Sequence, residues 1–305
     1  MRPKRLFVII ISIIVLFSFS IMAKKPPRLY NDLPGYLQDF KKTVERQARE
    51  YPDTFYLSAT TGEKVVALTF DDGPDLDNTP AILDILGEAG VKVTFFLVGE
   101  KVEKYPEITR RIMREGHQLA NHSWSHSDLR DLSNENILDK EIFPTSRLIA
   151  RLTGNYPRYL RPPYGAIKDR TIELLEQKGW KIVNWSLDSF DWNNSQNTPD
   201  EIIEKVERYI HPGAVILLHS GEVNSSTVEA LPELINRLKE KGYKFRTVEE
   251  LIPQGKGDYL TIDKLKELSR TLGVAFVKRS NWPLGVIIGH EGLLIDGDLY
   301  HFVFY

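Results

Sequence analysis

The chain has 305 residues, of which 42% are hydrophobic and 27% charged, a composition typical of a globular protein and not of a disordered or collagen-like chain. The formal net charge of −2 predicts no large basic surface, so we expect no nucleic-acid partner. The lack of cysteine excludes disulfides, thiolate metal ligands and a cysteine nucleophile.

The first 24 residues have the pattern of an export segment. Arg2, Lys4 and Arg5 precede an uncharged apolar run over residues 6–23, and a basic start followed by an apolar core is typical of a signal peptide. The run also approaches the ~20 residues that span a bilayer. Residues 1–24 are therefore interpreted as a signal peptide or an uncleaved N-terminal membrane anchor. The rest of the chain is expected outside the cytoplasm, either anchored to the membrane or secreted to the cell wall.

A linker containing a short amphipathic helix is expected over residues 25–63. Its first part is rich in turn-forming residues, namely Pro26, Pro27, Pro34 and Gly35. Apolar residues then repeat at helical spacing, at Leu37, Phe40, Val44 and Ala48.

Strands and helices are expected to alternate over residues 64–252. Apolar, β-rich runs predict strands over 65–70, 92–98, 118–121, 159–161, 181–187, 214–219 and 244–247. Helices are expected over 79–89, 106–115, 134–152, 169–178, 199–209 and 227–241. This alternation predicts an α/β fold with a parallel sheet. About seven units favour a distorted or incomplete (β/α) barrel, with a doubly wound sheet as the alternative.

A small α+β appendage of unassigned role is expected over residues 257–305. A helix is predicted over 261–272, and an Asp296-Gly297 pair between apolar segments predicts a hairpin turn. His290 and His301 are interpreted as surface or turn residues.

Two clusters of polar side chains follow early strands, where functional groups of parallel α/β proteins collect. Asp71 and Asp72 are adjacent acids, whose mutual repulsion a bound cation would relieve. His122 and His126 have a spacing that places both on one side of a helical turn, where they can bind one metal. Each pair alone is more often a solvated surface feature.

Three further clusters follow later strands. In the run Arg161-Pro162-Pro163-Tyr164-Gly165, two prolines hold backbone amides rigidly, as a developing oxyanion requires. The fourth cluster is Asp188-Ser189-Phe190-Asp191-Trp192, and the fifth is Leu217-Leu218-His219. His219 could be a core residue, or an acid whose pKa is set by Asp188 or Asp191.

Together, and in this order, the clusters resemble the five motifs of the polysaccharide deacetylase family, also called the NodB homology domain or carbohydrate esterase family 4. The resemblance covers about residues 64–252. It implies one divalent metal ion held by Asp72, His122 and His126, with zinc as the first expectation and cobalt, nickel or manganese as alternatives.

The resemblance also implies the remaining roles. Asp71 would be the general base, His219 the general acid, and Arg161 the residue that orients the base. The Tyr164 amide would stabilise the oxyanion, and Asp191, with Asp188 in reserve, would support Arg161 or His219. Contacts with the sugar are expected from Trp192, Tyr164, Pro163 and Leu217.

The expected activity is removal of N-acetyl groups from N-acetylglucosamine residues of a cell-wall or extracellular polysaccharide, peptidoglycan or a chitin-like oligosaccharide. Two alternatives stay open: an O-acetyl esterase acting on a xylan-type polysaccharide, and a catalytically silent cell-wall binding protein. The membrane is an expected partner if the N-terminal segment stays uncleaved. Protein partners and oligomeric state are not predicted.

Overall fold

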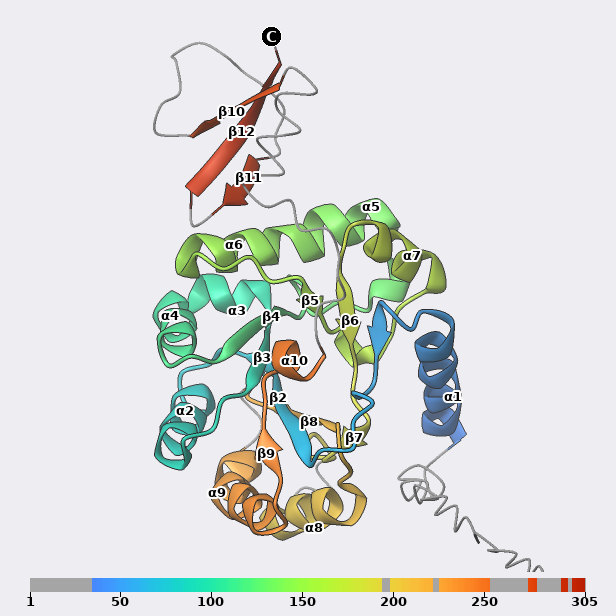
Figure 1. Cartoon of the computed structure of the whole chain (residues 1–305), viewed down its shortest axis with the longest axis vertical. Coiled ribbons are helices and arrows are strands. Elements are labelled where there is room, and N and C mark those ends of the chain that lie inside the picture. Colours follow the sequence, from blue (N-terminus) through green and yellow to red (C-terminus); the bar gives the residue numbers. More distant parts are fainter. Residues whose placement is uncertain are drawn as a thin grey trace, which may run out of the picture.

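The computed structural model describes residues 35–193, 198–221, 225–252, 274–278, 292–295 and 298–304 (Figure 1). The predicted export segment and the helix expected over 261–272 lie outside these ranges. Within them, no helix combines the length and the apolar character needed to cross a membrane.

A curled parallel sheet of nine strands lies at the centre of the larger unit (Figure 1). Its strands are β1 (Phe55–Tyr56), β2 (Val65–Gly73), β3 (Thr94–Leu97), β4 (Gln118–Asn121), β5 (Tyr159–Leu160), β6 (Lys181–Val183), β7 (Leu187–Asp188), β8 (Val215–His219) and β9 (Lys244–Phe245). Their order in space is β1-β6-β5-β4-β3-β2-β8-β7, and β9 pairs with β2. β1 and β7 are the two ends of this order and do not pair with each other, so the sheet is a barrel that does not close. This confirms the predicted fold class.

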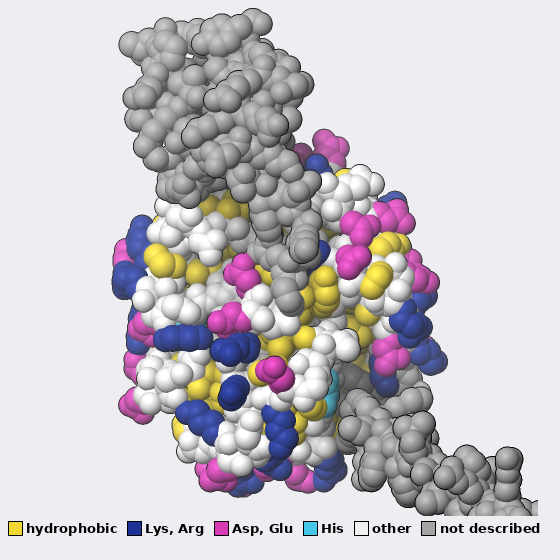
Figure 2. Space-filling model, viewed as in Figure 1, with side chains coloured by type: hydrophobic (Ala, Val, Ile, Leu, Met, Phe, Trp, Pro, Cys, Tyr) yellow, Lys and Arg dark blue, Asp and Glu magenta, His cyan; other side chains and the backbone are white. Residues whose placement is uncertain are grey.

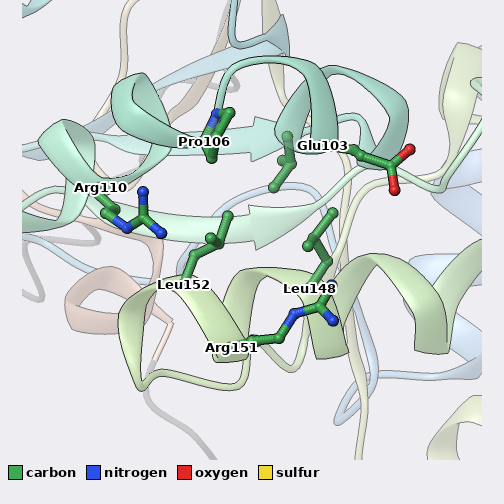
Figure 3. A pocket seen from close by; sticks show the side chains of 7 residues that line it. Glu103, Pro106, Arg110, Leu148, Arg151 and Leu152 are labelled. Carbon is green, nitrogen blue, oxygen red and sulfur yellow. The ribbon is translucent and has the colours of Figure 1, made fainter.

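Helices surround the strands on the outside of the barrel (Figure 1). They are α1 (Gly35–Glu50), α2 (Asn78–Ala89), α3 (Gly99–Lys104), α4 (Pro106–Arg114), α5 (Asn134–Asn136), the π-helix η2 (Ile137–Ile142), α6 (Phe143–Thr153), α7 (Asp169–Gln177), α8 (Pro199–Tyr209) and α9 (Ser225–Glu240). Figure 2 shows acidic and basic side chains interspersed over one face of this unit. A pocket of about 420 Å³ opens between α3, α4 and α6 (Figure 3). None of the side chains predicted to carry chemistry lines it.

Side chains alternate along β2 between two layers of the core. Val66, Leu68 and Phe70 pack outward in the cluster that includes helices α2, α8 and α9. Val65 and Ala67 point into the barrel. Because successive strand residues face opposite sides, Thr69 and Asp71 continue the inward series. The strand period thus carries a carboxylate into the barrel interior at the end of β2.

The short helix α10 (Val248–Leu251) closes the barrel at the amino ends of its strands. The α10 backbone N–H of Val248 donates to Thr94 Oγ1, at the first residue of β3, over 2.8 Å. Val248, Leu251 and Ile252 complete the interior cluster. The opposite, carboxyl edge of the sheet is therefore the edge left for the site.

Residues 35–59 pack on the barrel, which was predicted to begin at residue 64. Helix α1 packs through the stacked rings of Phe40 and Trp185, 5.9 Å apart, and Gln47 donates to the Ile167 carbonyl over 2.9 Å. β1 pairs in parallel with β6. A two-residue strand is too short to show a recognisable period in the sequence, and β1 was accordingly not predicted.

Two predicted elements are divided in the structure. The strand expected over 181–187 is two strands, because β6 pairs with β5 while β7 pairs with β8 on the other side of the barrel. The long helix expected over 134–152 contains η2 between α5 and α6. Apolar spacing alone does not distinguish a π turn from an α turn.

The described C-terminal strands form a three-stranded antiparallel sheet in the order β10-β12-β11. They are β10 (Val274–Lys278), β11 (Gly292–Ile295) and β12 (Asp298–Phe304). Ile295 pairs with Asp298, so β11 and β12 are neighbouring antiparallel strands, and the Asp296-Gly297 pair of the predicted turn lies outside the described residues. His301 lies within β12, and His290 lies outside the described residues.

Candidate active site

The five predicted clusters meet at the carboxyl edge of the sheet. β2 lies between β3 and β8, and Asp71 of β2 is the register partner of His219 of β8. Across the other side, β3 pairs with β4, and β4 pairs with β5, which precedes Arg161. Adjacent parallel strands therefore bring together residues that are far apart in the chain.

Asp72, His122 and His126 form a cluster with the donor set of a divalent metal site. Asp72 Oδ1 lies 3.3 Å from His122 Nε2 and 3.1 Å from His126 Nε2, and all three ligand atoms lie within 4.8 Å of one another. Two ligands bound tetrahedrally at about 2.0–2.1 Å from zinc would be about 3.3 Å apart. The observed separations therefore fit a single ion.

The hydrogen bonds around this cluster support the same interpretation. His122 Nδ1 lies 2.7 Å from the Arg161 carbonyl oxygen, so Nδ1 carries the proton and the Nε2 lone pair faces Asp72. Asp72 Oδ1 is buried and, within the described part of the chain, has no hydrogen-bond partner. A buried carboxylate oxygen without a donor, beside two imidazole nitrogens, fits a cation.

The prediction that His122 and His126 share a helical turn is wrong. Both lie in the loop after β4, which ends at Asn121. The loop bends at Ser123 and His126, whose φ angles are +66° and +57°, and the His126 N–H donates to Ser123 Oγ over 3.0 Å. The two imidazoles converge through left-handed backbone at two positions, for which the i, i+4 spacing gives no indication.

Asp71 is positioned by a fully buried arginine. Arg161 Nη1 donates to Asp71 Oδ1 over 2.7 Å and to Thr69 Oγ1 over 2.8 Å, while Nε donates to the Val183 carbonyl. Burial lowers the pKa of Arg161 from its ordinary value, and the neighbouring Asp71 carboxylate opposes this. Asp71 Oδ2 points to the metal cluster, 3.7 Å from His122 Nε2. One carboxylate oxygen is thus held and the other is available for proton transfer.

His219 is paired with Asp191. Its Nδ1 lies 2.7 Å from Asp191 Oδ1, and Asp191 Oδ2 accepts hydrogen bonds from the His219 backbone N–H and from Thr227 Oγ1. Burial lowers the pKa of His219, but the carboxylates around it, Asp191 first and then Asp72 and Asp71, together outweigh burial and raise the pKa to about 10. The imidazole is therefore cationic at neutral pH and can give up a proton.

Asp188 has a different environment. Its Oδ1 accepts from the Phe190 N–H over 2.8 Å and from Trp192 Nε1 over 3.2 Å. Burial raises the pKa of Asp188 to about 6. Of the two acids left open by the sequence, Asp191 contacts His219, and Asp188 orients the Trp192 ring.

Tyr164 has the backbone arrangement of an oxyanion donor. Its φ is +59°, and the next two amides, of Gly165 and Ala166, donate to the Pro162 and Pro163 carbonyls. No carbonyl of the described residues accepts from the Tyr164 N–H itself. The following Gly165 also has positive φ, and a Cβ there would lie 2.8 Å from Phe40 and Trp185. Close packing at Gly165 therefore fixes the direction of the preceding amide.

The predicted sugar contacts differ in accessibility. Tyr164 is 62% exposed and Trp192 41% exposed, so both side chains can contact a ligand. The Tyr164 ring lies 5.0 Å from the His126 ring. Pro163 is buried and Leu217 is only 2% exposed, which limits either residue to the base of the site.

Several residues of the site were not predicted. They are Thr69, Lys101, Glu141 and Thr227, which contact respectively Arg161, the Asp72 carbonyl, the loop between the two histidines, and Asp191. Among described residues, the non-glycine positions with positive φ are Asp72, Ser123, His126, Tyr164 and Phe190. All five lie in the predicted clusters, and such strained backbone is typical of functional sites.

Comparison with known proteins agrees with this geometry. Residues 58–183 match the family model described as polysaccharide deacetylase. A peptidoglycan-N-acetylglucosamine deacetylase of Bacillus cereus is 42% identical over 193 residues, which cover 63% of this chain and 69% of the relative. A peptidoglycan-N-acetylmuramic acid deacetylase of Bacillus subtilis is 35% identical, with 66% and 75% covered.

A solved structure has the same fold. It is a peptidoglycan N-acetylglucosamine deacetylase in complex with 4-naphthalen-1-yl-N-oxidanyl-benzamide, and it is 40% identical, with a TM-score of 0.62 over 64% of this chain and 91% of the other. The residues matched by the family model, 58–183, contain Asp71, Asp72, His122, His126 and Arg161, whereas Asp191 and His219 follow them in the chain. By sequence, by fold and by the arrangement of these side chains, the chain belongs to the polysaccharide deacetylase family.

Proposed function

We propose that the chain is a metal-dependent hydrolase that removes N-acetyl groups from N-acetylglucosamine residues of a cell-wall polysaccharide, with peptidoglycan as the substrate. One observation carries the proposal: the Asp72, His122 and His126 cluster lies beside a base held by Arg161, and an acid held by Asp191 lies on the strand next to that base. The names of the Bacillus relatives support the substrate class.

The surroundings of Asp71, Tyr164 and His219 allow each of them to carry out one step of the hydrolysis. Asp71, held through Oδ1 by Arg161, takes a proton from the attacking water. The Tyr164 amide donates a hydrogen bond to the oxygen that becomes negative as the acetyl carbon turns tetrahedral. His219 gives its proton to the leaving nitrogen, because an amine anion is too basic to leave unprotonated. The products are acetate and a free amino sugar.

Asp72, His122 and His126 would hold the metal. When bound, a divalent ion would supply Lewis-acid chemistry, polarising a water molecule and the acetyl oxygen. Zinc is the ion we propose, because a set of one carboxylate and two imidazoles with positions left open is typical of catalytic zinc. Cobalt, nickel and manganese suit the same donors, and reconstitution with each ion would rank them.

Two buried contacts, of Arg161 with Asp71 and of Asp191 with His219, favour an active enzyme over a catalytically silent binding protein. A sugar-binding surface needs exposed aromatic rings such as Tyr164 and Trp192, but it has no use for a buried arginine fixed on Asp71 or for an ion pair on His219. An O-acetyl esterase would use the same base and metal. The ion pair that holds His219 on Asp191 favours the amide, since only the amide depends strongly on a proton donor.

A decisive experiment is mass spectrometry of acetylated glycan fragments before and after incubation with the purified protein. Peptidoglycan fragments and chitin oligosaccharides should lose acetyl groups from nitrogen, and acetylxylan should lose few. Asp71→Asn is the matched control, because the amide keeps the shape of the side chain and cannot act as a base. Acetate released only from the ester, or no difference between wild type and Asp71→Asn, would contradict the proposal.

We also propose that the enzyme acts outside the cytoplasmic membrane. The basic residues before the apolar run of residues 6–23 favour an N-terminus retained inside. Protease added to wall-stripped cells should digest the barrel. If the barrel is digested only after the membrane has been disrupted, it lies inside the cell, and the proposed location is wrong.

A further inference from the structure

The π-helix η2 lies next to the loop that carries both metal-binding histidines. It follows α5 and continues into α6, so one helix changes from α to π and back to α. Helix α6 packs on β4, the strand that leads into the loop. Single π turns inside α-helices cost hydrogen-bond geometry and are found mostly at functional positions. The contacts of this turn show what it does here.

Glu141, in η2, holds the middle of the loop. Its Oε2 accepts hydrogen bonds from the backbone N–H groups of Trp124 and Ser125, each over 2.9 Å. Its Oε1 accepts from Ser125 Oγ over 2.8 Å. Trp124 and Ser125 lie between His122 and His126 in the chain, and Glu141 is only 7% exposed. A buried carboxylate therefore grips the loop through three donors.

The next residue of η2 holds the start of the same loop. The Ile142 carbonyl accepts from Asn121 Nδ2 over 2.8 Å, and Asn121 Oδ1 accepts from the Ser123 N–H over 2.8 Å. In a π turn the hydrogen bonds run from i to i+5, so the side chains and carbonyls around it are rotated relative to a regular helix. In η2, consecutive residues Glu141 and Ile142 both contact the loop.

The contacts leave Glu141 no role as a ligand. Both of its oxygens accept hydrogen bonds from the loop. Among the described residues, the cluster that could hold a metal consists of Asp72, His122 and His126 and does not include Glu141. We infer that Glu141 is a positioning residue for the metal site: its carboxylate holds the loop in the strained conformation that turns His122 and His126 toward Asp72. This inference rests on the proposed metal-dependent function.

The test compares variants at one position with a control in the same turn. Glu141→Ala removes all three hydrogen bonds, and Glu141→Gln keeps an oxygen that can accept from both amides. Asp139→Asn changes an exposed acid of η2 that makes no contact with the loop. The measurements on the full-length protein are zinc affinity by competition with a chromophoric chelator, the visible spectrum of the cobalt-loaded protein, and the melting temperature of the metal-free protein.

Loss of a group that orients metal ligands typically weakens metal affinity ~10–100-fold, and we expect this for Glu141→Ala, together with an altered cobalt spectrum. Glu141→Gln should recover most of the affinity, and Asp139→Asn should match wild type. Ser125→Ala, which removes one of the three hydrogen bonds, should give a smaller loss and serves if Glu141→Ala does not fold.

The outcomes separate the two proposals. If wild type binds zinc and Glu141→Ala binds it equally well with an unchanged cobalt spectrum, the positioning role is wrong, even if the metal-free variant melts earlier. Equal weakening by Glu141→Gln and Glu141→Ala would also overturn it. If wild type itself binds no zinc or cobalt, the proposed metal-dependent function fails instead.

Discussion

Replacing Asp191 by Asn should change the pH dependence of catalysis through His219. In the wild type, burial lowers the pKa of His219, and Asp191, together with Asp72 and Asp71, outweighs it and raises the pKa to about 10. Asn keeps a side-chain oxygen near Nδ1 but removes the negative charge. Burial is then opposed only by Asp72 and Asp71, whose negative charge a bound cation would offset, so we expect the pKa to fall from about 10 toward the ~6.5 of an ordinary histidine.

The size of the effect follows from the protonated fraction. At pH 8, a histidine with a pKa of about 6.5 is ~3% protonated, whereas one with a pKa of about 10 is almost fully protonated. The variant should therefore lose ~30-fold or more in kcat/KM at pH 8 through protonation alone. At pH 5.5 both imidazoles are largely protonated, so the remaining difference measures lost orientation. A bound cation would lower the pKa of His219 in both wild type and Asp191→Asn, so the test is the difference between the two proteins.

The assay is acetate release from an N-acetylglucosamine oligomer between pH 5.5 and 9. The ratio of wild-type to variant kcat/KM should rise as the pH rises. Asp188→Asn is the comparison variant, because that carboxylate hydrogen-bonds to Trp192 Nε1 and makes no hydrogen bond with His219, so its pH profile should change much less than that of Asp191→Asn. A constant ratio across the range for Asp191→Asn would refute the assignment of His219 as the proton donor tuned by Asp191.

Three further predictions concern the metal, the leaving group and stability. Chelation should abolish acetate release and added zinc or cobalt should restore it, while His126→Ala should weaken zinc binding by orders of magnitude; full activity of a metal-free preparation would exclude the mechanism. His219→Ala should cost ~10²–10⁴-fold on an N-acetyl substrate and less on an O-acetyl ester, and equal losses on both would show that the residue does not protonate the leaving group. Asp188 has a pKa of about 6 when folded and an ordinary value of 3.8, so the folded state binds more protons between these values and its stability falls as the pH rises through them. The free energy of unfolding of metal-free Asp188→Asn, relative to that of metal-free wild type, should therefore rise by about 1 kcal/mol from pH 5 to pH 7.5, as measured by urea unfolding. A difference that does not change with pH would contradict a buried carboxyl group that binds a proton in this range.

The alternation of strands and helices was predictable because it depends on local periodicity. The buried runs that became β2 and β8 are continuous apolar segments, and each ends at a residue of the site, Asp71 and His219. Their meeting followed from the rule that parallel strands share one carboxyl edge. The motif residues were recognisable for the same reason, because each stands in the last residues of a strand or shortly after one.

The supports of the site were not predictable from local pattern. Thr227 reaches Asp191 from helix α9, and Glu141 reaches the metal loop from a helix 16 residues beyond Ser125. Neither lies near a motif, and an acid or a threonine on a helix ordinarily indicates a solvated face. The loop of His122 and His126 was predicted as a helical turn because spacing reports only separation along the chain, whereas its conformation depends on those distant contacts.

The position of α10 sets the shortest chain that can keep a working barrel. Val248, Leu251 and Ile252 fill the interior at the amino ends of the strands, and burial of each such side chain is worth about 1.5–3 kcal/mol. A chain stopped before residue 247 would open the barrel at its base and expose Phe96 and Val183 to water. A chain stopped after residue 252 keeps these contacts. Because the last residues of the barrel lie at the end opposite the catalytic edge, protein fused after Ile252 starts away from that edge.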